Sequence, residues 1–462
     1  MKKFTRILIC LILCVFTIGL AACGDNQDNF TYPTASMQTY GNGGLSVQKG
    51  DYLYFVNGYQ SADNMTEKNA SYHVGAIMIA KLDENGNLIL NDEGLLGDDY
   101  YRVMSDKLCG FEATGLYIFG DYLYFTSPCQ ENEAGTDGEW AKGRVDFYRI
   151  RLDNSGSVER LYTSGVENEN LQYEYYYDGN NTFILVYESG DTLNSSGGTN
   201  ILKRIDANDA SSTEISRDVS SVVMADDSDK IFYVTTDDDE RYVLNKYDIV
   251  NNNSSQYLGK FTNEITAKFV VNGYVYIEET HGSNMDLKRS RISTSGAFTD
   301  FVPGISNYTT YEITPNGEMV IGITDNVIDF YLFGNTSPSL NFVEDADIET
   351  INFIGFANGS IVYYDDNNAI KMVSYANFIS NPGLTPEIVT LATLSDVNTD
   401  YFDLDDNYLY FYKTVGSNSY LHRLSVNNNN GETEEMVGVY LEADIPDEEE
   451  ETDESNTEES AN

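Results

Sequence analysis

The sequence predicts an all-β fold, a β-propeller of four-stranded antiparallel blades, with eight blades favoured and seven as the alternative. The first observation behind this prediction is a repeated hexapeptide: GDYLYF occurs at 50–55 and at 120–125, and DNYLYF occurs at 406–411. The second is a recurring turn followed by an apolar arm. These arms start near residues 52, 122, 182, 231, 274, 318, 360 and 408. Repeats of about 40 to 50 residues with four strands each are typical of propeller blades.

Each repeat begins with a predicted hairpin. Its turn is rich in Asn, Gly and Asp, which tolerate the positive φ of tight two-residue turns. The arm after the turn is rich in Tyr, Phe, Ile and Val, which favour strands. This arm is apolar at consecutive positions, as in VNGYVYI at 271–277. We therefore expect it to be buried on both faces.

A second pair of strands follows each hairpin, for example within 76–90, 146–162 and 420–436. If the strands of a blade are labelled A to D from the axis outward, the B–C and D–A connections share one rim. The long connections are the B–C segments 57–75, 127–144 and 189–199 and the D–A segment 91–110. We therefore expect the first three blades to carry elaborated loops on one rim, where binding commonly resides.

The binding-rim candidates are side chains of these long connections, namely Tyr59, Tyr72, His73 and Trp140. Trp140 is the only tryptophan in the chain and stands among polar residues. Such a side chain could stack on a sugar or fill a pocket of a protein partner. The alternative is that Trp140 packs its own loop against the propeller.

The first 22 residues predict a lipoprotein signal peptide. Basic residues precede an apolar run at 7–20, which has the length of a signal h-region and is too short to span a bilayer comfortably. The run ends in Leu20-Ala21-Ala22-Cys23, which resembles the lipobox of bacterial lipoproteins. The resemblance implies cleavage before Cys23 and attachment of acyl chains such as palmitate to that residue. The alternative is an ordinary secretory signal that contains a cysteine.

The expected domain order follows from the two ends of the chain. It is a signal peptide at 1–22, a lipid-anchored polar tether at 23–43, the propeller at 44–441 and an acidic disordered tail at 442–462. We expect the protein on the extracytoplasmic face of a bacterial cell membrane. Its formal net charge of −47 argues against nucleic acid as a partner, because both are strongly anionic, and it permits cationic partners or bound cations.

Two cysteines, Cys109 and Cys129, would stay in the exported chain besides the lipidated one. In a hairpin, the residue numbers of opposite partners have a constant sum, which is about 241 for the turn at Gly120-Asp121. The numbers 109 and 129 sum to 238, so the two cysteines lie close to opposite positions. The two thiols are therefore expected to be neighbours on one rim. We expect a disulfide between them, with two reduced thiols as the alternative.

No motif in the sequence predicts catalysis or a cofactor. His73, His281 and His422 are isolated, and the sequence contains no HExxH, GxSxG, phosphate-binding loop or zinc-ligand spacing. Paired carboxylates could exist among so many acids, but no spacing marks a pair. The acid clusters at 237–240 and 403–406 could hold Ca²⁺, yet neither has the EF-hand spacing. We therefore expect them to be solvated turns.

Four short stretches resemble degenerate YWTD motifs. They are Tyr54-Phe55-Val56-Asn57, Tyr124-Phe125-Thr126-Ser127, Tyr233-Val234-Thr235-Thr236-Asp237 and Tyr363-Tyr364-Asp365-Asp366. Together with the (L/I)-x-R-(I/L)-x-L-D stretches that follow, they make residues 44–440 similar to the bacterial branch of low-density-lipoprotein-receptor-related β-propellers, a domain family of unknown function. The chain departs from that family because no copy holds a Trp and because YWTD propellers have six blades.

These observations predict a non-catalytic binding scaffold for a protein or a glycan. One alternative is a secreted enzyme that acts on polysaccharide or peptide through carboxylates at the propeller axis. Another is an accessory subunit of a cell-envelope complex. Acids or histidines that converge at the axis, buried and with shifted pKa values, would favour the enzyme.

Overall fold

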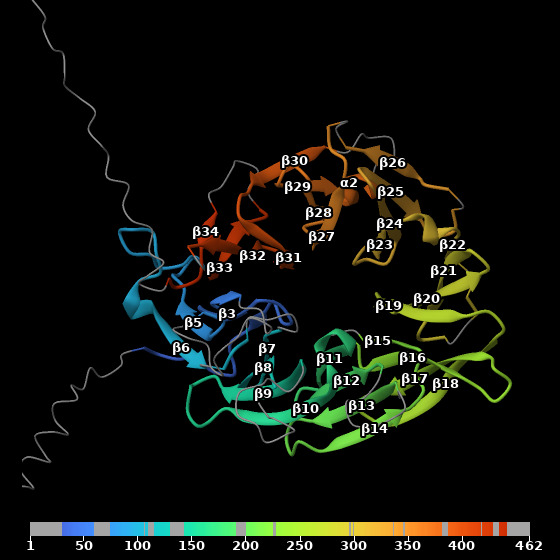
Figure 1. Cartoon of the computed structure of the whole chain (residues 1–462), viewed down its shortest axis with the longest axis horizontal. Coiled ribbons are helices and arrows are strands. Elements are labelled where there is room, and N and C mark those ends of the chain that lie inside the picture. The colour runs from blue at the N-terminus through green and yellow to red at the C-terminus, as the bar shows by residue number, and fades with distance from the viewer. Residues whose placement is uncertain are drawn as a thin grey trace, which may run out of the picture.

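A ring of eight antiparallel sheets makes up the part of the chain that the structure, a computed structural model, describes (Figure 1). That part comprises residues 30–59, 74–105, 107–109, 115–129, 143–190, 200–224, 228–294, 297–298, 300–335, 337–344, 347–380, 387–416, 418–427 and 434–440. The sheets follow one another along the chain and are numbered blades 1 to 8. The prediction of an eight-bladed propeller is therefore confirmed.

Blades 1 to 4 come from the first half of the chain. Blade 1 holds β1 (Thr39–Tyr40), β2 (Ser46–Lys49), β3 (Tyr52–Val56), β5 (Ile77–Lys81) and β6 (Tyr101–Ser105). Blade 2 holds β7 (Tyr117–Phe119), β8 (Tyr122–Pro128), β9 (Arg144–Arg151) and β10 (Glu159–Glu167). Blade 3 holds β11 (Leu171–Tyr177), β12 (Thr182–Glu188), β13 (Ile201–Asp206) and β14 (Ser212–Ser216). Blade 4 holds β15 (Ser221–Val223), β16 (Lys230–Thr236), β17 (Tyr242–Asp248) and β18 (Asn253–Phe261).

Blades 5 to 8 complete the ring. Blade 5 holds β19 (Ile265–Val271), β20 (Tyr274–His281), β21 (Asn284–Arg291) and β22 (Asp300–Val302). Blade 6 holds β23 (Thr310–Ile313), β24 (Met319–Thr324), β25 (Val327–Leu332) and β26 (Leu340–Val343). Blade 7 holds β27 (Ile351–Ala357), β28 (Ser360–Asp365), β29 (Ala369–Ser374) and β30 (Ile388–Thr393). Blade 8 holds β31 (Val397–Leu404), β32 (Tyr408–Val415), β33 (Asn418–Ser425) and β34 (Glu435–Met436).

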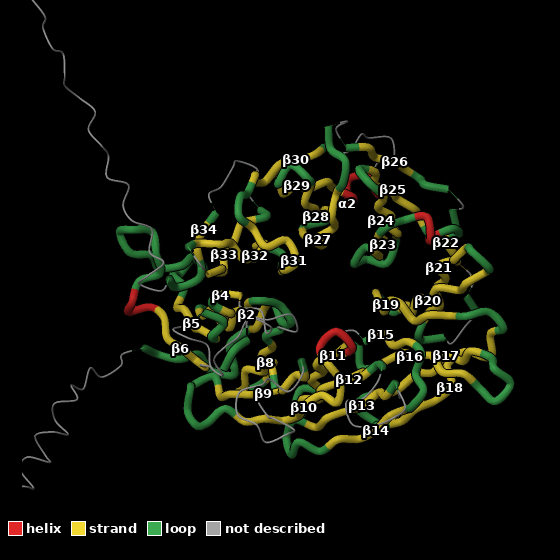
Figure 2. The backbone as a smooth tube through the Cα atoms, viewed as in Figure 1, coloured by secondary structure: helices red, strands yellow, loops and turns green. Residues whose placement is uncertain are grey.

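Helices play a small part in the described residues. They are the short 3-10 turns η3 (Asp98–Tyr100), η4 (Asn168–Asn170) and η5 (Ile305–Asn307) and the helix α2 (Tyr375–Ser380). None of the helices in this part of the chain is long and apolar enough to cross a membrane. In blades 2 to 8 the first strand lies nearest the centre of the ring, and the later strands lie progressively farther out (Figure 2).

The repeated hexapeptide forms the A–B turn and the strand after it, which is covered on both faces. In β3, Leu53 belongs to the apolar cluster that blade 1 forms with blade 8, and Tyr54 belongs to the cluster that it forms with blade 2. The Tyr54 hydroxyl also donates a hydrogen bond to the carbonyl oxygen of Leu152 in blade 2, at 3.1 Å. Because alternate side chains of a strand point to opposite faces, a strand between two neighbouring sheets must be apolar at consecutive positions.

Among the described residues, eight hydrophobic clusters join the blades, and each spans one pair of neighbours. One of them places Phe55 and Met78 of blade 1 against Tyr412 and Leu421 of blade 8. The last blade therefore packs on the first, and the ring of apolar contacts is continuous.

A repeated arginine ties several blades to the next one. The guanidinium of Arg204, in β13, lies over the ring of Phe183 with its Cζ 4.5 Å from the ring centroid. Its Nη1 donates to the carbonyl oxygen of Ile249 in blade 4 at 2.8 Å. Arg149 and Arg289 occupy the same place in β9 and β21, and they donate to the carbonyl oxygens of Ala207 and Gly317 in blades 3 and 6. Arg149 and Arg204 are arginines of the x-R-(I/L) stretches in the sequence, whereas Arg289 is followed by Ser290.

The ring closes where the segment after β3 joins blade 8. The short strand β4 (Gly58–Tyr59) pairs with β33, with Tyr59 opposite Ser419. The buried amide of Asn57 donates to the carbonyl oxygen of Val439 at 2.9 Å and accepts from the Val439 N–H at 2.6 Å. A Cβ on Gly58 would lie 2.3 Å from the carbonyl oxygen of Ser419, so only glycine permits this approach.

A buried carboxyl forms a second contact across the same seam. Oδ2 of Asp403, in β31, accepts a hydrogen bond from the backbone N–H of Leu45 at 2.8 Å. A Cβ on Gly44 would lie 2.1 Å from this carboxyl, so the glycine leaves room for it. Burial raises the pKa of Asp403 to about 7 although the hydrogen bond from Leu45 acts in the opposite direction.

The N-terminal boundary of the propeller lies earlier than the sequence predicts. β1 pairs with β2, so residues from the predicted tether belong to blade 1. The ring of Phe30 packs on the ring of Tyr52 with centroids 6.0 Å apart, and the guanidinium of Arg102 lies over Phe30. The predicted signal at 1–22, Cys23 and the tail at 442–462 lie outside the described residues.

The outer part of blade 1 also differs from the prediction. The last strand is β6, whereas residues 82–100 form two tight turns with the isolated bridges Leu82–Leu88 and Leu90–Leu96. The side chains of Asp83 and Asn91 accept hydrogen bonds from backbone N–H groups of the turns that follow them. These local bonds fold the chain back before a ladder can form. The segment 91–110 is therefore not a D–A connection.

In the structure Cys109 and Cys129 are both buried, and the predicted disulfide does not join them. The expected register does hold at Tyr117 opposite Tyr124, where the numbers sum to 241. However, β7 is only three residues long, and the chain before it leaves the ladder. The N–H of Cys109 donates to Gly75 in blade 1, whereas that of Cys129 donates to Arg144 in blade 2.

The arginine ties lead to a testable prediction for stability. We expect Arg204→Met to lower the free energy of unfolding by about 2 kcal/mol, because it removes a hydrogen bond from a charged group and leaves the Ile249 carbonyl without that donor. Urea unfolding followed by circular dichroism measures the change. Arg217→Met is the matched control, since Arg217 pairs with Glu214 on the surface and exposed pairs contribute roughly 0–1 kcal/mol. Equal losses in the two variants would contradict the proposed role of Arg204.

Candidate functional site

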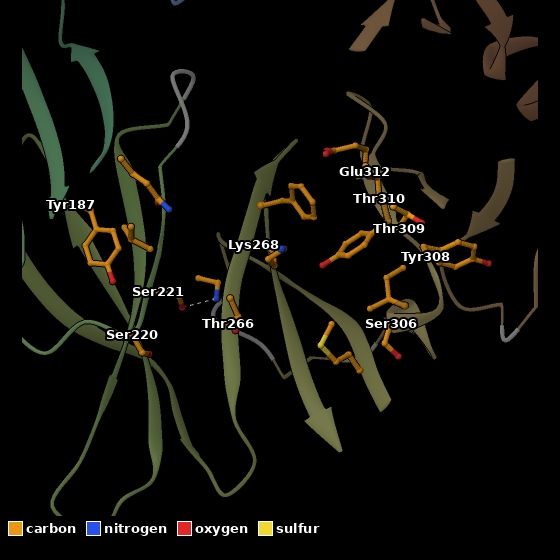
Figure 3. A pocket seen from close by; sticks show the side chains of 17 residues that line it. Tyr187, Ser220, Ser221, Thr266, Lys268, Ser306, Tyr308, Thr309, Thr310 and Glu312 are labelled. Atoms are coloured by element: carbon orange, nitrogen blue, oxygen red, sulfur yellow. Dashed lines mark hydrogen bonds between the residues drawn. The ribbon is translucent and has the colours of Figure 1, made fainter. Parts of the chain in front are cut away.

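A cleft of about 790 Å³ lies on the inner side of blades 3 to 6 (Figure 3). Its lining comes from the beginnings of β11, β15, β19 and β23 and from residues 305–309. In blades 3 to 6, the first strand begins at the rim where the B–C and D–A connections leave. The cleft therefore opens toward the rim that the sequence favours for binding, although on later blades.

Lys268 enters the cleft from an irregularity in β19. Ala267 pairs with Ile277 and Phe269 pairs with Tyr276, so Lys268 is an extra residue in the ladder. Such bulges re-aim a side chain. The Lys268 ammonium lies 5.5 Å from the centre of the Tyr311 ring.

The cation of Lys268 is balanced by a buried acid. Its Nζ lies 3.7 Å from Oε1 of Glu278. Glu278 also accepts a hydrogen bond from the hydroxyl of Tyr311. Burial, and then this carboxylate, hold the pKa of Tyr311 well above its usual value. The ring of Tyr311 is thereby fixed edge-on against Phe269, with centroids 5.8 Å apart and an interplanar angle of 77°.

Glu312 reaches into the cleft from β23, on the other side from Lys268 (Figure 3). Burial raises the pKa of its carboxyl to about 7, and the positive charge of Lys268 partly opposes this rise. Among the residues that the structure describes, none donates a hydrogen bond to the Glu312 side chain or accepts one from Lys268. The cleft thus holds a carboxyl and an ammonium that both have hydrogen-bonding capacity to spare.

Tyr308 forms a rigid wall of the cleft. Its hydroxyl contacts the hydroxyl of Tyr331 and Oδ2 of Asp329, each at 2.7 Å. A Cβ on Gly322 would lie 2.7 Å from the ring of Tyr308, so the glycine in β24 allows the ring to lie on this strand. The chain enters the wall through Gly304, whose φ is +68°.

Hydroxyl groups line the opposite side. Oγ of Ser221 accepts a hydrogen bond from the N–H of Ala267 at 3.0 Å, which ties the first strands of blades 4 and 5 together. The hydroxyl of Tyr187 donates to the carbonyl oxygen of Val219 at 2.9 Å. Further hydroxyl side chains of the lining are Ser220, Thr266, Ser306, Thr309 and Thr310.

The predicted rim residues do not lie in this cleft. Tyr72, His73 and Trp140 are outside the described residues. Tyr59 is half-buried at the closing seam, where its ring packs on Tyr401 with centroids 4.6 Å apart and its hydroxyl accepts a hydrogen bond from the Tyr401 hydroxyl. Tyr59 is therefore part of the ring closure.

The isolated histidines have separate surroundings. His422 lies in β33, where it is buried, and its Nδ1 is 2.6 Å from Oε1 of Glu434. His281 is more exposed and contacts Asn263. Within the described ranges, no group of three or more His, Cys, Asp and Glu side chains could hold a metal ion.

The acid cluster at 237–240 and the end of the cluster at 403–406 act as turns, whereas Asp403 lies in β31 with its carboxyl at the closing seam. Asp237 accepts hydrogen bonds from the backbone N–H groups of Asp239 and Arg241 and pairs with the side chain of Lys260. In the second cluster, Asp405 accepts from the N–H of Asn407 at 2.7 Å and from that of the next residue. These oxygens stabilise the turns that they begin.

The cleft residues Lys268, Tyr308, Tyr311 and Glu312 are absent from the sequence-based candidates. One signal could have found three of them. They are polar or aromatic side chains in the arm before a hairpin turn, in TAKF at 266–269 and TTYEI at 309–313. That arm is the strand nearest the axis, so its polar side chains border the central channel. Tyr308 has no such signal, because it belongs to an irregular connection.

Two carboxyls on first strands, Glu312 and Asp403, have pKa values raised to about 7. They belong to different blades, 6 and 8. Asp403 accepts a backbone hydrogen bond at the closing seam, whereas Glu312 faces the cleft. Among the described lining residues, Glu312 is the one carboxyl, so these residues do not form the converging acids that would favour an enzyme.

Comparisons with known proteins find similarity in fold only. No family model matches the chain, and no curated protein sequence matches it. The Dos1 propeller is 11% identical with a TM-score of 0.46, over 86% of this chain and 95% of that one. The C-terminal WD40 domain of Sif2 is 10% identical with a TM-score of 0.38, over 66% and 78%. The β-propeller domain of the Trilobed protease from Pyrococcus furiosus is 11% identical with a TM-score of 0.41, over 71% and 96%. Likeness at this level says nothing about function.

The raised pKa of Glu312 leads to a prediction for the pH dependence of stability. Its folded-state pKa of about 7 lies above the ordinary value of 4.5, so the folded chain holds this proton more tightly. The contribution to stability is present below pH 4.5 and is lost as the pH rises to 7. Asp403 acts in the same direction. We expect Glu312→Gln to make the fall in the free energy of unfolding across this window less steep.

Urea unfolding at a series of pH values measures this slope. Glu318→Gln is the control, because Glu318 is exposed in the turn of the same blade. The account of Glu312 fails if its variant shows the same slope as the wild type, and it is supported if only this variant flattens the curve.

Proposed function

We propose that the chain is a non-catalytic binding scaffold, lipid-anchored on the extracytoplasmic face of a bacterial cell membrane, that takes a protein or a glycan in the cleft of blades 3 to 6. The observation that carries the proposal is the cleft itself. It presents the ammonium of Lys268 and the carboxyl of Glu312, both with hydrogen-bonding capacity to spare, on the strands of a closed ring. Pockets of roughly 300–1,000 Å³ with a few convergent polar groups are typical ligand sites.

Binding accounts for the lining better than catalysis does. Glycoside hydrolysis uses two carboxyls that flank the scissile bond, roughly 5 to 9.5 Å apart. The described lining offers one, Glu312, and neither a histidine nor a cysteine. The enzyme alternative would therefore need a second acid from a part of the chain beyond this lining.

The lipid anchor and the cleft would lie on opposite rims. The N–H of Gly50, in the turn between β2 and β3, donates to the carbonyl oxygen of Gln38, and Phe30 packs on Tyr52 just after that turn. The described chain therefore starts at the rim of the A–B turns. Residues 24–29 separate it from Cys23, and the seven steps from Cys23 to Phe30 can span at most about 25 Å. This short link would hold the A–B rim against the membrane and leave the cleft open on the far side.

The anchor is tested by Cys23→Ser. We expect this variant to move from the membrane fraction to the soluble fraction and to lose metabolically incorporated palmitate, because the acylated thiol is gone. Cell fractionation with radiolabelled palmitate measures both. Cys10→Ser, within the signal segment, is the control and should behave as the wild type does. A Cys23→Ser protein that keeps its label would refute the anchor.

The binding role is tested by filling the cleft. We expect Thr309→Trp, which places a large side chain at an exposed position of the lining, to abolish capture of the component that the wild type retains from solubilised cell envelopes. Thr294→Trp alters an exposed threonine on the opposite rim and should leave capture unchanged. Quantitative mass spectrometry and glycan analysis of the eluates measure recovery. Equal recovery by all three proteins would contradict the proposed site.

A further inference from the structure

The cleft has three features that together limit its ligand chemistry, and an inference from them rests on the proposed binding function. The first is the pair of polar groups that come from opposite sides. The ammonium of Lys268 can only donate hydrogen bonds, whereas the carboxyl of Glu312 can accept them and, when protonated, can also donate. A ligand that satisfies both must carry donors and acceptors close together. Hydroxyl groups do both at once.

The second feature is the aromatic surface of the lining. Phe269 and Tyr311 meet edge to face, and Tyr308 is held by its hydroxyl on the far wall. Aromatic side chains offer a broad apolar surface with fixed orientation. The C–H faces of a pyranose ring pack on such a surface while its hydroxyl groups project sideways toward polar partners.

The third feature is the balance of charge. The positive charge of Lys268 is already opposed by Glu278, and burial favours the neutral form of Glu312, so the cleft does not select a strongly ionic ligand. The charge of −47 on the whole chain repels anionic polymers. A cationic peptide would have to approach the ammonium of Lys268. The charges in the cleft and on the whole chain therefore favour a neutral ligand.

We propose that the cleft binds a neutral oligosaccharide whose hydroxyl groups accept from Lys268 and exchange hydrogen bonds with Glu312. Its sugar rings pack on Phe269 and Tyr311, and Ser and Thr hydroxyls of the lining contact its edges. A cleft of about 790 Å³ has room for a short oligosaccharide. The bulge in β19 has a role in this arrangement, because it aims Lys268 at the ligand.

The experiment uses the full-length chain purified in detergent. Binding is measured on an array of neutral oligosaccharides that includes cellohexaose, chitohexaose and maltohexaose, with a lysine hexapeptide as the cationic probe. The best binder is then titrated by calorimetry. We expect saturable binding of at least one neutral oligosaccharide, and we expect Lys268→Met and Glu312→Gln each to raise its Kd about tenfold or more, as loss of a hydrogen bond to a charged group does.

Matched controls separate the cleft from general effects of charge and folding. Lys260→Met and Glu318→Gln make the same chemical changes on blades 4 and 6 outside the cleft and should leave the Kd unchanged. Lys268→Arg keeps the cation and should retain more binding than Lys268→Met. Circular dichroism confirms that each variant is folded before it is titrated.

Several outcomes would overturn the inference. They are no binding to any neutral oligosaccharide, binding that Lys268→Met and Glu312→Gln leave unchanged, and binding of the lysine hexapeptide alone. If no sugar binds but Thr309→Trp still abolishes capture from envelopes, the scaffold function stands and the oligosaccharide is wrong. If no sugar binds and Thr309→Trp leaves capture from envelopes unchanged, both the scaffold function and the oligosaccharide inference fail.

Discussion

The contact between blade 8 and blade 1 is the constraint on which the whole architecture depends. Every blade is a sheet with two apolar faces, and each face is covered by a neighbour. An open row of such sheets would expose one apolar face at each end, and closure removes both ends at once. The chain achieves this through Asn57 and Asp403, whose partners Val439 and Leu45 lie more than 350 residues away along the sequence. Because the entropy cost of closing a loop grows only slowly with its length, a few well-placed hydrogen bonds can maintain such a contact.

The closed ring also explains how a binding site can form from short strands. The cleft takes its walls from four blades, and no single blade contains enough of it to bind a ligand. The relative positions of these blades are fixed by the apolar clusters and by ties such as the one from Arg204 to the Ile249 carbonyl. A side chain such as Lys268 therefore projects from a rigid frame, and the energy of ligand binding need not be used to order it.

Much of the fold can be predicted from the sequence because its signals are local. The turn at Asn272-Gly273 has φ values of +47° and +74°, which Asn and Gly adopt readily, and the strand after it is apolar at consecutive positions. The same signals locate the second strand of every blade. The outer strand of blade 1 could not be located in this way, because the side chains of Asp83 and Asn91 end the ladder locally.

The site is harder to predict because it depends on contacts between distant segments. The bulge that turns Lys268 toward the cleft leaves no mark in the sequence TAKF, and Glu312 resembles any acid before a turn. The thiol pairing failed for a related reason. The prediction assumed that the pairing on either side of the turn at Gly120-Asp121 continues as far as Cys109. The pairing covers only the three residues of β7, and the N–H of Cys109 instead donates to Gly75 in blade 1. Tyr59 shows the reverse case, since a residue expected on a binding rim contributes to closing the ring.

The most direct test of the closed ring is a cysteine pair across its seam. In the structure Tyr59 and Ser419 are directly opposite each other in adjacent strands, at a separation that a disulfide can bridge. We predict that the Tyr59→Cys, Ser419→Cys protein forms this disulfide rapidly under mild oxidation, as peptide mass spectrometry would show. The control pair is Tyr59→Cys, Thr414→Cys. Thr414 lies in β32, on the other side of β33 from Tyr59, so this pair should not form a disulfide. Equal linkage in the two proteins, or none in the first, would contradict the closed ring.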